Sequence, residues 1–183
     1  MVTEIDFSNS LDSKRQRLRE IVGGGALQYP LSFQDSLQLY NDAPSLYIGT
    51  NCYAYALGLT EPYPHSEWKA NGEAQLYSPG AVSGQVALPN FFTGDEMMDA
   101  VLADLVFLGL KSVSRIKRRS MRLACFVRAK ELNFRRVDFH FARRDDSGLY
   151  SHKMGWISLP EILGARPVVE RYRQVRIINI AQQ

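Results

Sequence analysis

Two segments that lie far apart in the chain carry side chains able to do nucleophilic chemistry together. The first, residues 51–57, reads Asn-Cys-Tyr-Ala-Tyr-Ala-Leu, and the second places His140 and His152 twelve positions apart. The whole chain has only two cysteines and three histidines. A thiol becomes a strong nucleophile where a helix N-terminus or an imidazole favours its thiolate form. The pattern therefore predicts Cys52 as a nucleophile, with one of the two histidines as its general base.

The residues around Cys52 favour a helix that begins near the cysteine. Gly49-Thr50-Asn51 is a polar approach to a compact apolar run, 52–59, which we expect to be helical. In that position the backbone N–H of Cys52 can help to form an oxyanion hole, which stabilises a transition state by about 3 kcal/mol. Asn51 and Tyr53 are further candidates for oxyanion or substrate contacts. The alternative is that Cys52 is a small core residue of an apolar helix.

The two histidines are expected on one β-hairpin. Strands at 136–143 and 149–157 flank Asp145-Asp146-Ser147-Gly148, which is a turn sequence. If the hairpin is centred on this turn with an odd-residue loop, His140 and His152 lie directly opposite each other, with Cβ atoms ~5 Å apart. One imidazole can then act as the base while the other holds its tautomer and orientation.

Two features leave this geometry open. A bulge at Gly148 would move His152 to a diagonal position or to the other face of the sheet. Asp138 lies two positions before His140 and so shares its face, which makes Asp138 the alternative orienting group. Each histidine taken alone can also be an ordinary hydrogen-bonded residue of a half-buried strand.

The remaining pattern indicates helices in the first part of the chain and an antiparallel sheet in the second, an order typical of an α+β fold. We expect one domain over 1–183, with a helical and irregular extension at 1–48 and a catalytic core at 49–183. The clearest helix is 94–110, with apolar residues at helical spacing. The other expected elements are a helix at 11–22, a short helix at 33–40, a long loop at 61–89, and strands at 123–129 and 175–180.

The composition, with 45% hydrophobic and 22% charged residues, is ordinary for a globular protein. The net charge of +3 is too small to predict a nucleic-acid-binding protein. Six basic residues nevertheless crowd the segment from Lys111 to Arg122, which is either a solvated surface or a contact for an anionic partner. A non-enzymatic domain that binds an anionic partner through this segment is therefore the alternative to an enzyme.

Several other classes lack their sequence signals. Cys52 and Cys125 do not make a disulfide framework in a chain of this length. Cys52 and the three histidines lack the close spacing of a zinc site, so neither a metal nor an organic cofactor is expected. No run of about 18 apolar residues predicts a membrane span. The polar segment 1–10 lacks the layout of a secretory signal, so we expect a cytoplasmic protein or one exported by a signal-independent route.

A cysteine at a helix start, followed by an antiparallel sheet with a histidine on one strand and a polar partner on the next, resembles the NlpC/P60 group of papain-like cysteine peptidases. The resemblance covers residues 50–157 approximately. It implies a papain-like α+β fold in which the nucleophile helix packs on the sheet. It also implies Cys52 as nucleophile, His140 as base and His152 as the orienting residue of a Cys-His-His triad, which needs no cofactor.

The same resemblance implies a bacterial thiol hydrolase (a peptidase or amidase) that acts on a peptide or protein amide, such as a peptidoglycan stem peptide. A toxin-like secreted effector of this kind would also have an inhibitor or immunity protein as a partner. The sequence departs from the group at Asn51-Cys52-Tyr53-Ala54, where Asp-Cys-Ser-Gly is usual. Because the architecture also hosts deamidases and acyltransferases that modify host proteins, the reaction and the substrate stay open.

Overall fold

The computed structural model describes residues 33–34, 37, 51–57, 78–80, 83, 93–115, 121–130, 133–144, 147–155 and 158–182. Its elements in these ranges are α4 (Cys52–Leu57), α5 (Gly94–Phe107), β1 (Leu110–Val113), β2 (Met121–Lys130), β3 (Asn133–Arg144), β4 (Tyr150–Lys153), β5 (Pro160–Gly164) and β6 (Arg173–Gln182). Residues 33–34 and 37 are helical, within the short helix expected there. The helix expected at 11–22 and most of the loop expected at 61–89 lie outside the described residues.

Helix α5 starts where its sequence can satisfy the free N–H groups of a first turn. The Thr93 side chain accepts a hydrogen bond from the Glu96 backbone N–H at 3.2 Å, and the Glu96 carboxylate accepts one from the Thr93 N–H at 3.3 Å. This reciprocal capping box fixes the start of the helix. The helix ends at Phe107, earlier than expected, because Gly109 turns the backbone with φ 72° and Leu110 opens strand β1.

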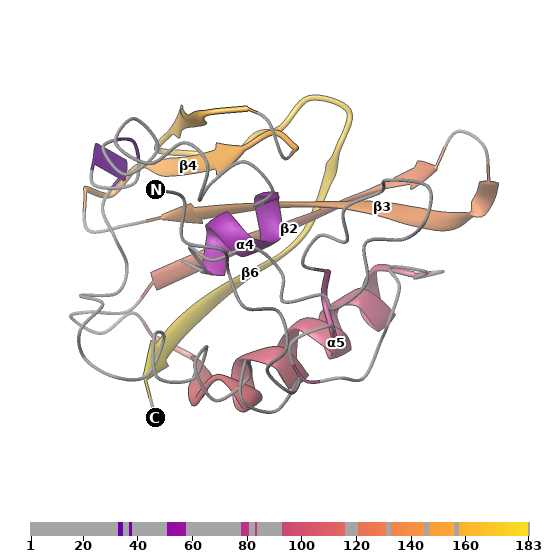
Figure 1. The fold of residues 1–183 in the computed structure, drawn as a ribbon, viewed down its shortest axis with the longest axis horizontal. Coiled ribbons are helices and arrows are strands. Elements are labelled where there is room, and N and C mark those ends of the chain that lie inside the picture. The colour runs from indigo at the N-terminus through magenta and orange to yellow at the C-terminus, as the bar shows by residue number, and fades with distance from the viewer. Residues whose placement is uncertain are drawn as a thin grey trace, which may run out of the picture.

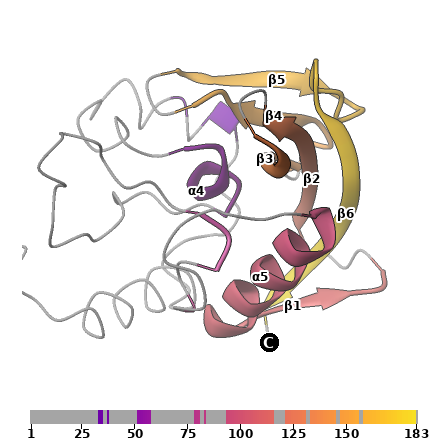
Figure 2. The same cartoon turned by 90° about the vertical axis from the view of Figure 1, so that its right-hand side faces the viewer.

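The six strands form one antiparallel sheet in the order β1-β6-β2-β3-β4-β5. Strands β2 and β3 form its long central pair, in which Cys125 lies opposite Phe141. Strand β6, the last in the chain, inserts between β1 and β2. Figures 1 and 2 show the sheet curving around α4 and α5, which lie on the same side of it.

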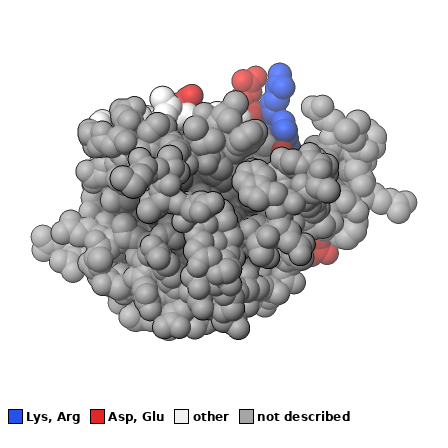
Figure 3. Space-filling view, viewed as in Figure 1, with Lys and Arg blue, Asp and Glu red and all other residues white. Residues whose placement is uncertain are grey.

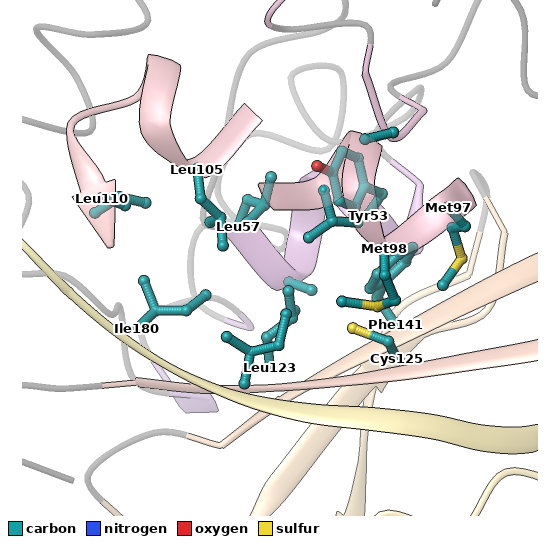
Figure 4. Packing of buried hydrophobic residues seen from close by; sticks show 14 of the residues in the cluster. Tyr53, Leu57, Met97, Met98, Leu105, Leu110, Leu123, Cys125, Phe141 and Ile180 are labelled. Carbon is teal, nitrogen blue, oxygen red and sulfur yellow. The ribbon is translucent and has the colours of Figure 1, made fainter. Parts of the chain in front are cut away.

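The main core lies between the two helices and the face of the sheet that they cover. Leu57 from α4 and Leu105 from α5 meet Phe141, Leu123 and Ile180 from the strands (Figure 4). Each fully buried side chain of this kind contributes about 1.5–3 kcal/mol relative to an exposed one. A second, smaller cluster covers the opposite face of the central strands and comprises Ala124, Phe126, Ala142, Tyr150 and Val169. Strands β2 and β3 are therefore buried on both faces.

The strands expected at 123–129, 136–143 and 175–180 fall within β2, β3 and β6. The strand expected at 149–157 is shorter, because β4 ends at Lys153. The sequence did not predict β1 or β5. Strand β1 has only four residues, and β5 starts with a proline and is largely exposed at the edge of the sheet, so neither carries a clear alternation of apolar and polar residues.

Candidate active site

Helix α4 has six residues, too few to be stable alone, so its position depends on its cap and its contacts. The side-chain oxygen of Asn51 accepts hydrogen bonds from the backbone N–H groups of Tyr53 at 3.1 Å and Ala54 at 3.0 Å. The Asn51 carbonyl accepts a hydrogen bond from the Tyr55 N–H at 3.0 Å. This is N-cap geometry, and it makes Cys52 the first residue of the helix.

The Cys52 thiol is buried against the central strand β3. It belongs to the main core together with Phe141, and the residue is 6% exposed. Burial raises the pKa of Cys52 to about 12, while hydrogen bonding from the Phe141 backbone and the charge of Lys153 act in the opposite direction. At neutral pH the sulfur is therefore a protonated thiol in this structure.

Cys52, on α4, lies beside the part of β3 that carries the first histidine. Phe141, whose backbone hydrogen-bonds the sulfur, directly follows His140 in the chain. Strand β4 pairs with β3 only from Ala142 to Arg144, so the sulfur lies next to the point where this pairing stops.

Neighbouring residues of β3 point to opposite faces of the sheet. Phe141 lies in the main core beside Cys52, whereas the His140 ring packs on the other face, with centroid distances of 6.2 Å to Phe126 and 5.3 Å to Tyr172. Among the residues that the structure describes, no hydrogen bond joins the Cys52 sulfur to either histidine. The structure thus brings Cys52 to the backbone beside His140 without a direct bond between thiol and imidazole.

The two histidines do come together. His140 Nε2 and His152 Nδ1 are 2.8 Å apart, and the rings meet edge to face with centroids 5.0 Å apart. His152 pairs with Ala142, so the histidines are diagonal neighbours on one face, not the direct opposites that a turn centred on residue 146 predicts. Because Arg144 pairs with Tyr150, the loop between them has five residues and its centre lies one residue later, which keeps both imidazoles on the same face.

Both imidazoles are neutral at pH 7. Burial, with a smaller contribution from the neighbouring His152, lowers the pKa of His140 to about 3. Burial also lowers the pKa of His152. The carboxylate of Glu161 has a smaller effect in the opposite direction and raises this pKa. Glu161 lies directly opposite His152 on β5, with 3.9 Å between Glu161 Oε2 and His152 Nε2. Sequence reasoning missed this carboxylate because it did not predict β5.

Asp138, the alternative orienting group, is bonded elsewhere. Its Oδ2 accepts hydrogen bonds from Arg128 Nε at 2.9 Å and from the Tyr172 hydroxyl at 2.7 Å. The Arg128 guanidinium also lies 4.8 Å from the centre of the Tyr172 ring, which in turn packs against His140. Burial and the bond to Asp138 raise the pKa of Tyr172. Asp138 therefore positions Tyr172 against the His140 ring, while the ring nitrogen is bonded to His152.

The face of the sheet that α4 covers holds polar side chains that sequence reasoning missed. The Tyr55 hydroxyl and Ser151 Oγ are 2.7 Å apart, which links α4 to β4. Arg143, which is 1% exposed, donates from Nη1 to the Tyr55 carbonyl at 3.0 Å and places its guanidinium 4.3 Å from the centre of the Tyr55 ring. Alternation along β3 and β4 is the signal that could have placed Arg143 and Ser151 on the face opposite the histidines.

Lys153 is a buried cation on the same face. Its exposed fraction is 0%, and its Nζ donates a hydrogen bond to the Gly155 carbonyl at 2.8 Å. Burial lowers the pKa of Lys153 to about 8, while the charge of an ionised Cys52 would raise it. Cys52 and Lys153 therefore each favour the charged form of the other.

Tyr53, a candidate for oxyanion or substrate contacts, holds α4 in place. Its hydroxyl donates to Asp104 Oδ2 at 2.9 Å, and its N–H is one of the two that Asn51 caps. Asp104 is fully buried on α5 and also accepts hydrogen bonds from the N–H groups of Gly80 at 2.8 Å and Ser83 at 2.7 Å. Burial raises the pKa of Asp104. Asn51 and Tyr53 thus have structural partners in the free protein.

The basic segment is described only in part. Lys111 and Arg115 are exposed, Arg122 donates to Asn179 Oδ1 at 3.2 Å, and 116–120 lie outside the described residues, as does His65. Figure 3 shows a few acidic and basic side chains among the described residues of one face. The described residues include no group of three or more His, Cys, Asp or Glu side chains placed to hold a metal ion. None of the described helices has the length and apolar character needed to cross a membrane.

A scan of the chain against protein-family models and searches of the curated proteins and of the solved structures give no match. The function therefore rests on the chemistry of these side chains and not on a relative.

Proposed function

We propose that this chain is a thiol hydrolase that cleaves a peptide or amide bond through a thioester on Cys52, within a papain-like α+β fold. His140 is its general base and acid, and His152 orients His140. One observation carries the proposal. The Asn51 cap sets Cys52 at a helix start against the backbone of Phe141, whose neighbour His140 shares a 2.8 Å hydrogen bond with His152.

The thiol and the imidazole need one further movement to meet. In free enzymes the catalytic hydrogen bonds are often long or poorly aligned, and they tighten in the complex with substrate. The pairing of β3 with β4 does not extend to Phe141, so the movement takes place at a strand edge that β4 does not pair with. We expect substrate binding to bring the sulfur and the His140 ring together around this edge.

The resting state is a neutral thiol beside a neutral imidazole, which favours general-base catalysis over a preformed ion pair. Burial raises the pKa of Cys52 and lowers that of His140, so neither group is charged at pH 7. His140 accepts the thiol proton as the sulfur attacks the carbonyl carbon. The same proton then goes to the leaving amine as the C–N bond breaks and the thioester remains. Water, deprotonated by His140, attacks the thioester and releases the acid, and the proton returns to the sulfur.

The developing oxyanion needs N–H donors, and the first N–H groups of a helix have no partner within the helix. The Cys52 N–H is such a group, so it is the oxyanion donor of the proposal, worth about 3 kcal/mol in the transition state.

An acceptor other than water would resolve the same thioester by acyl transfer, and a side-chain amide substrate would make the reaction a deamidation. A bacterial wall peptide and a host protein are the two substrate classes to screen.

The test is the rate at which iodoacetamide alkylates Cys52 between pH 5 and 9. Peptide mass spectrometry separates Cys52 from Cys125, which is fully buried and whose pKa is raised by burial. We expect Cys52 labelling at pH 6–7 that falls about 100-fold in His140→Ala, the low end of the range for general-base catalysis. His152→Ala should cause a smaller loss.

A matched control replaces Asp138, which shares the face of His140 but bonds Arg128 and Tyr172. If Asp138→Asn lowers the rate more than His152→Ala, Asp138 and not His152 orients the base. If Cys52 labels only above pH 8.5, as an ordinary thiol does, or labels at the same rate without His140, the hydrolase proposal is wrong.

A further inference from the structure

Three polar side chains form a row across the face of the sheet that carries the histidines. His140 on β3, His152 on β4 and Glu161 on β5 follow one another from the central strand to the edge strand. The contacts in the row are specific to single atoms. His140 Nε2 meets His152 Nδ1 at 2.8 Å, and His152 Nε2 faces Glu161 Oε2 at 3.9 Å.

A neutral imidazole carries one proton on one of its two nitrogens, so the row allows two arrangements. In the first, His140 Nε2–H donates to a bare His152 Nδ1, and the His152 proton sits on Nε2, facing Glu161. In the second, His152 Nδ1–H donates to His140 Nε2, and a bare His152 Nε2 faces the carboxylate. Only the first leaves His140 Nδ1 bare and able to accept a proton from a thiol.

We infer that Glu161 is a positioning residue that selects the first arrangement and so keeps His140 Nδ1 available as the base. A carboxylate attracts an N–H and repels a nitrogen lone pair, so its charge favours a proton on His152 Nε2. The distance of 3.9 Å is too long for a direct hydrogen bond, so the effect is electrostatic. This inference rests on the proposed function for its catalytic meaning, but the tautomer that it assigns is a property of the free protein.

The other groups that face His140 do not reproduce this selection. Tyr172 and Phe126 present ring surfaces to the imidazole. Asp138 and Arg128 act on the His140 charge with opposite signs, and they are bonded to each other. Among the described residues, Glu161 is the charged group that faces the far nitrogen of His152, at 3.9 Å. Its side chain is 71% exposed, so its replacement removes a charge at little cost to folding.

The experiment is nitrogen-15 NMR of the histidine side chains in the whole chain at pH 7.5. The protonated and bare ring nitrogens resonate far apart, so their shifts report the tautomer directly. We expect wild-type His140 and His152 both to carry their protons on Nε2. Glu161→Gln should shift the tautomer ratio by about two- to fivefold, the size of an exposed electrostatic interaction. Glu161→Lys should move it further in the same direction, because a lysine donates to a bare His152 Nε2.

The control is Asp99→Asn, which removes an exposed carboxylate from α5, on the other side of the sheet. It should leave both tautomers unchanged. A wild-type His140 that carries its proton on Nδ1, or a tautomer ratio that does not respond to Glu161→Lys, would overturn the inference. If the tautomers behave as expected but Cys52 is unreactive, the positioning by Glu161 stands and the hydrolase proposal fails. If the tautomers shift and the Cys52 alkylation rate does not fall in parallel, Glu161 has no part in the reaction.

Discussion

At the scale of single residues, Lys153 is a basic side chain in a fully buried position. A lysine is seldom fully buried. Lys153 has no exposed surface, donates a hydrogen bond to the Gly155 carbonyl, and lies on the same face of the sheet as Cys52. Its ammonium group favours the thiolate of Cys52, and a thiolate there would favour the ammonium. The cation near the sulfur is therefore a lysine, while the imidazoles lie on the other face.

This arrangement predicts a pH-dependent effect of Lys153 on the thiol. The pKa of Lys153 is lowered to about 8, so its charge is present below pH 8 and is lost above it. Lys153→Met should slow Cys52 alkylation by up to about tenfold at pH 6–7, the equivalent of one pKa unit. The wild-type and variant rates should converge above pH 8. Rates that coincide at every pH would show that the two groups do not interact.

The matched control for that experiment is Lys111→Met, which removes an exposed lysine of β1. It should leave the alkylation profile unchanged, because water and salt screen the charge of a distant exposed side chain. Methionine has a stem of similar length to that of lysine, so the buried variant removes the charge and keeps most of the packing.

At the scale of elements, the short helix α4 is held by polar contacts at its start and along its sides. Asn51 caps its start, the Tyr55 hydroxyl reaches Ser151, and the Tyr53 hydroxyl reaches Asp104. Asp104 joins α4 and α5 to Gly80 and Ser83, since it accepts hydrogen bonds from Tyr53, Gly80 and Ser83. A buried carboxylate with three donors thus fixes the helix that begins with Cys52.

Asp104 should leave a mark on the pH dependence of stability. Its pKa is raised above the ordinary 3.8, so the folded state binds a proton more tightly than the unfolded chain. The stability from this group is fully present below pH 3.8 and is lost as the pH rises through the raised pKa. Asp104→Asn should remove this pH dependence. It should also lower the free energy of unfolding by about 1–3 kcal/mol, because an amide nitrogen replaces one acceptor oxygen.

Urea unfolding between pH 3.5 and 7.5 measures both effects. Asp99→Asn on the exposed side of the same helix is the control and should change stability by less than about 0.5 kcal/mol. If Asp104→Asn keeps the wild-type pH dependence, the buried carboxylate is not the titrating group.

The elements show what local sequence can and cannot predict. The start of α5 was predictable because Thr93 and Glu96 make a capping box from neighbouring residues. Cys52 at the start of α4 followed likewise from Asn51 before an apolar run. Asp104 was not identified as an anchor, because its partners come from distant parts of the chain. Glu161 was missed because the edge strand that carries it has no alternating pattern.

At the scale of the whole molecule, the central strand β3 divides the polar residues into two groups. Cys52, Arg143 and Lys153 lie on the face that the helices cover, and His140 and His152 lie on the other. The sequence predicted the hairpin and the shared face of the histidines. It did not predict the division, since only the packing of α4 decides which face the thiol meets. The proposed chemistry therefore depends on the part of β3 at Phe141, beside Cys52, where the pairing with β4 has stopped.

The buried histidines predict how the whole fold responds to acid. The pKa of His140 is lowered from 6.5 to about 3 by burial, so the unfolded chain binds a proton more tightly than the folded protein. Stability from this group is complete above pH 6.5 and is lost as the pH falls toward 3. The free energy of unfolding should fall by up to about 1.4 kcal/mol per pH unit for this single proton.

Asp104 has the opposite dependence, so the difference between wild type and His140→Gln isolates the histidine. That difference, measured by urea unfolding at each pH from 7.5 to 4, should shrink as the pH falls. A difference that stays constant would mean that His140 is already protonated or exposed in the folded protein, and then it could not serve as the neutral base that the proposed reaction needs.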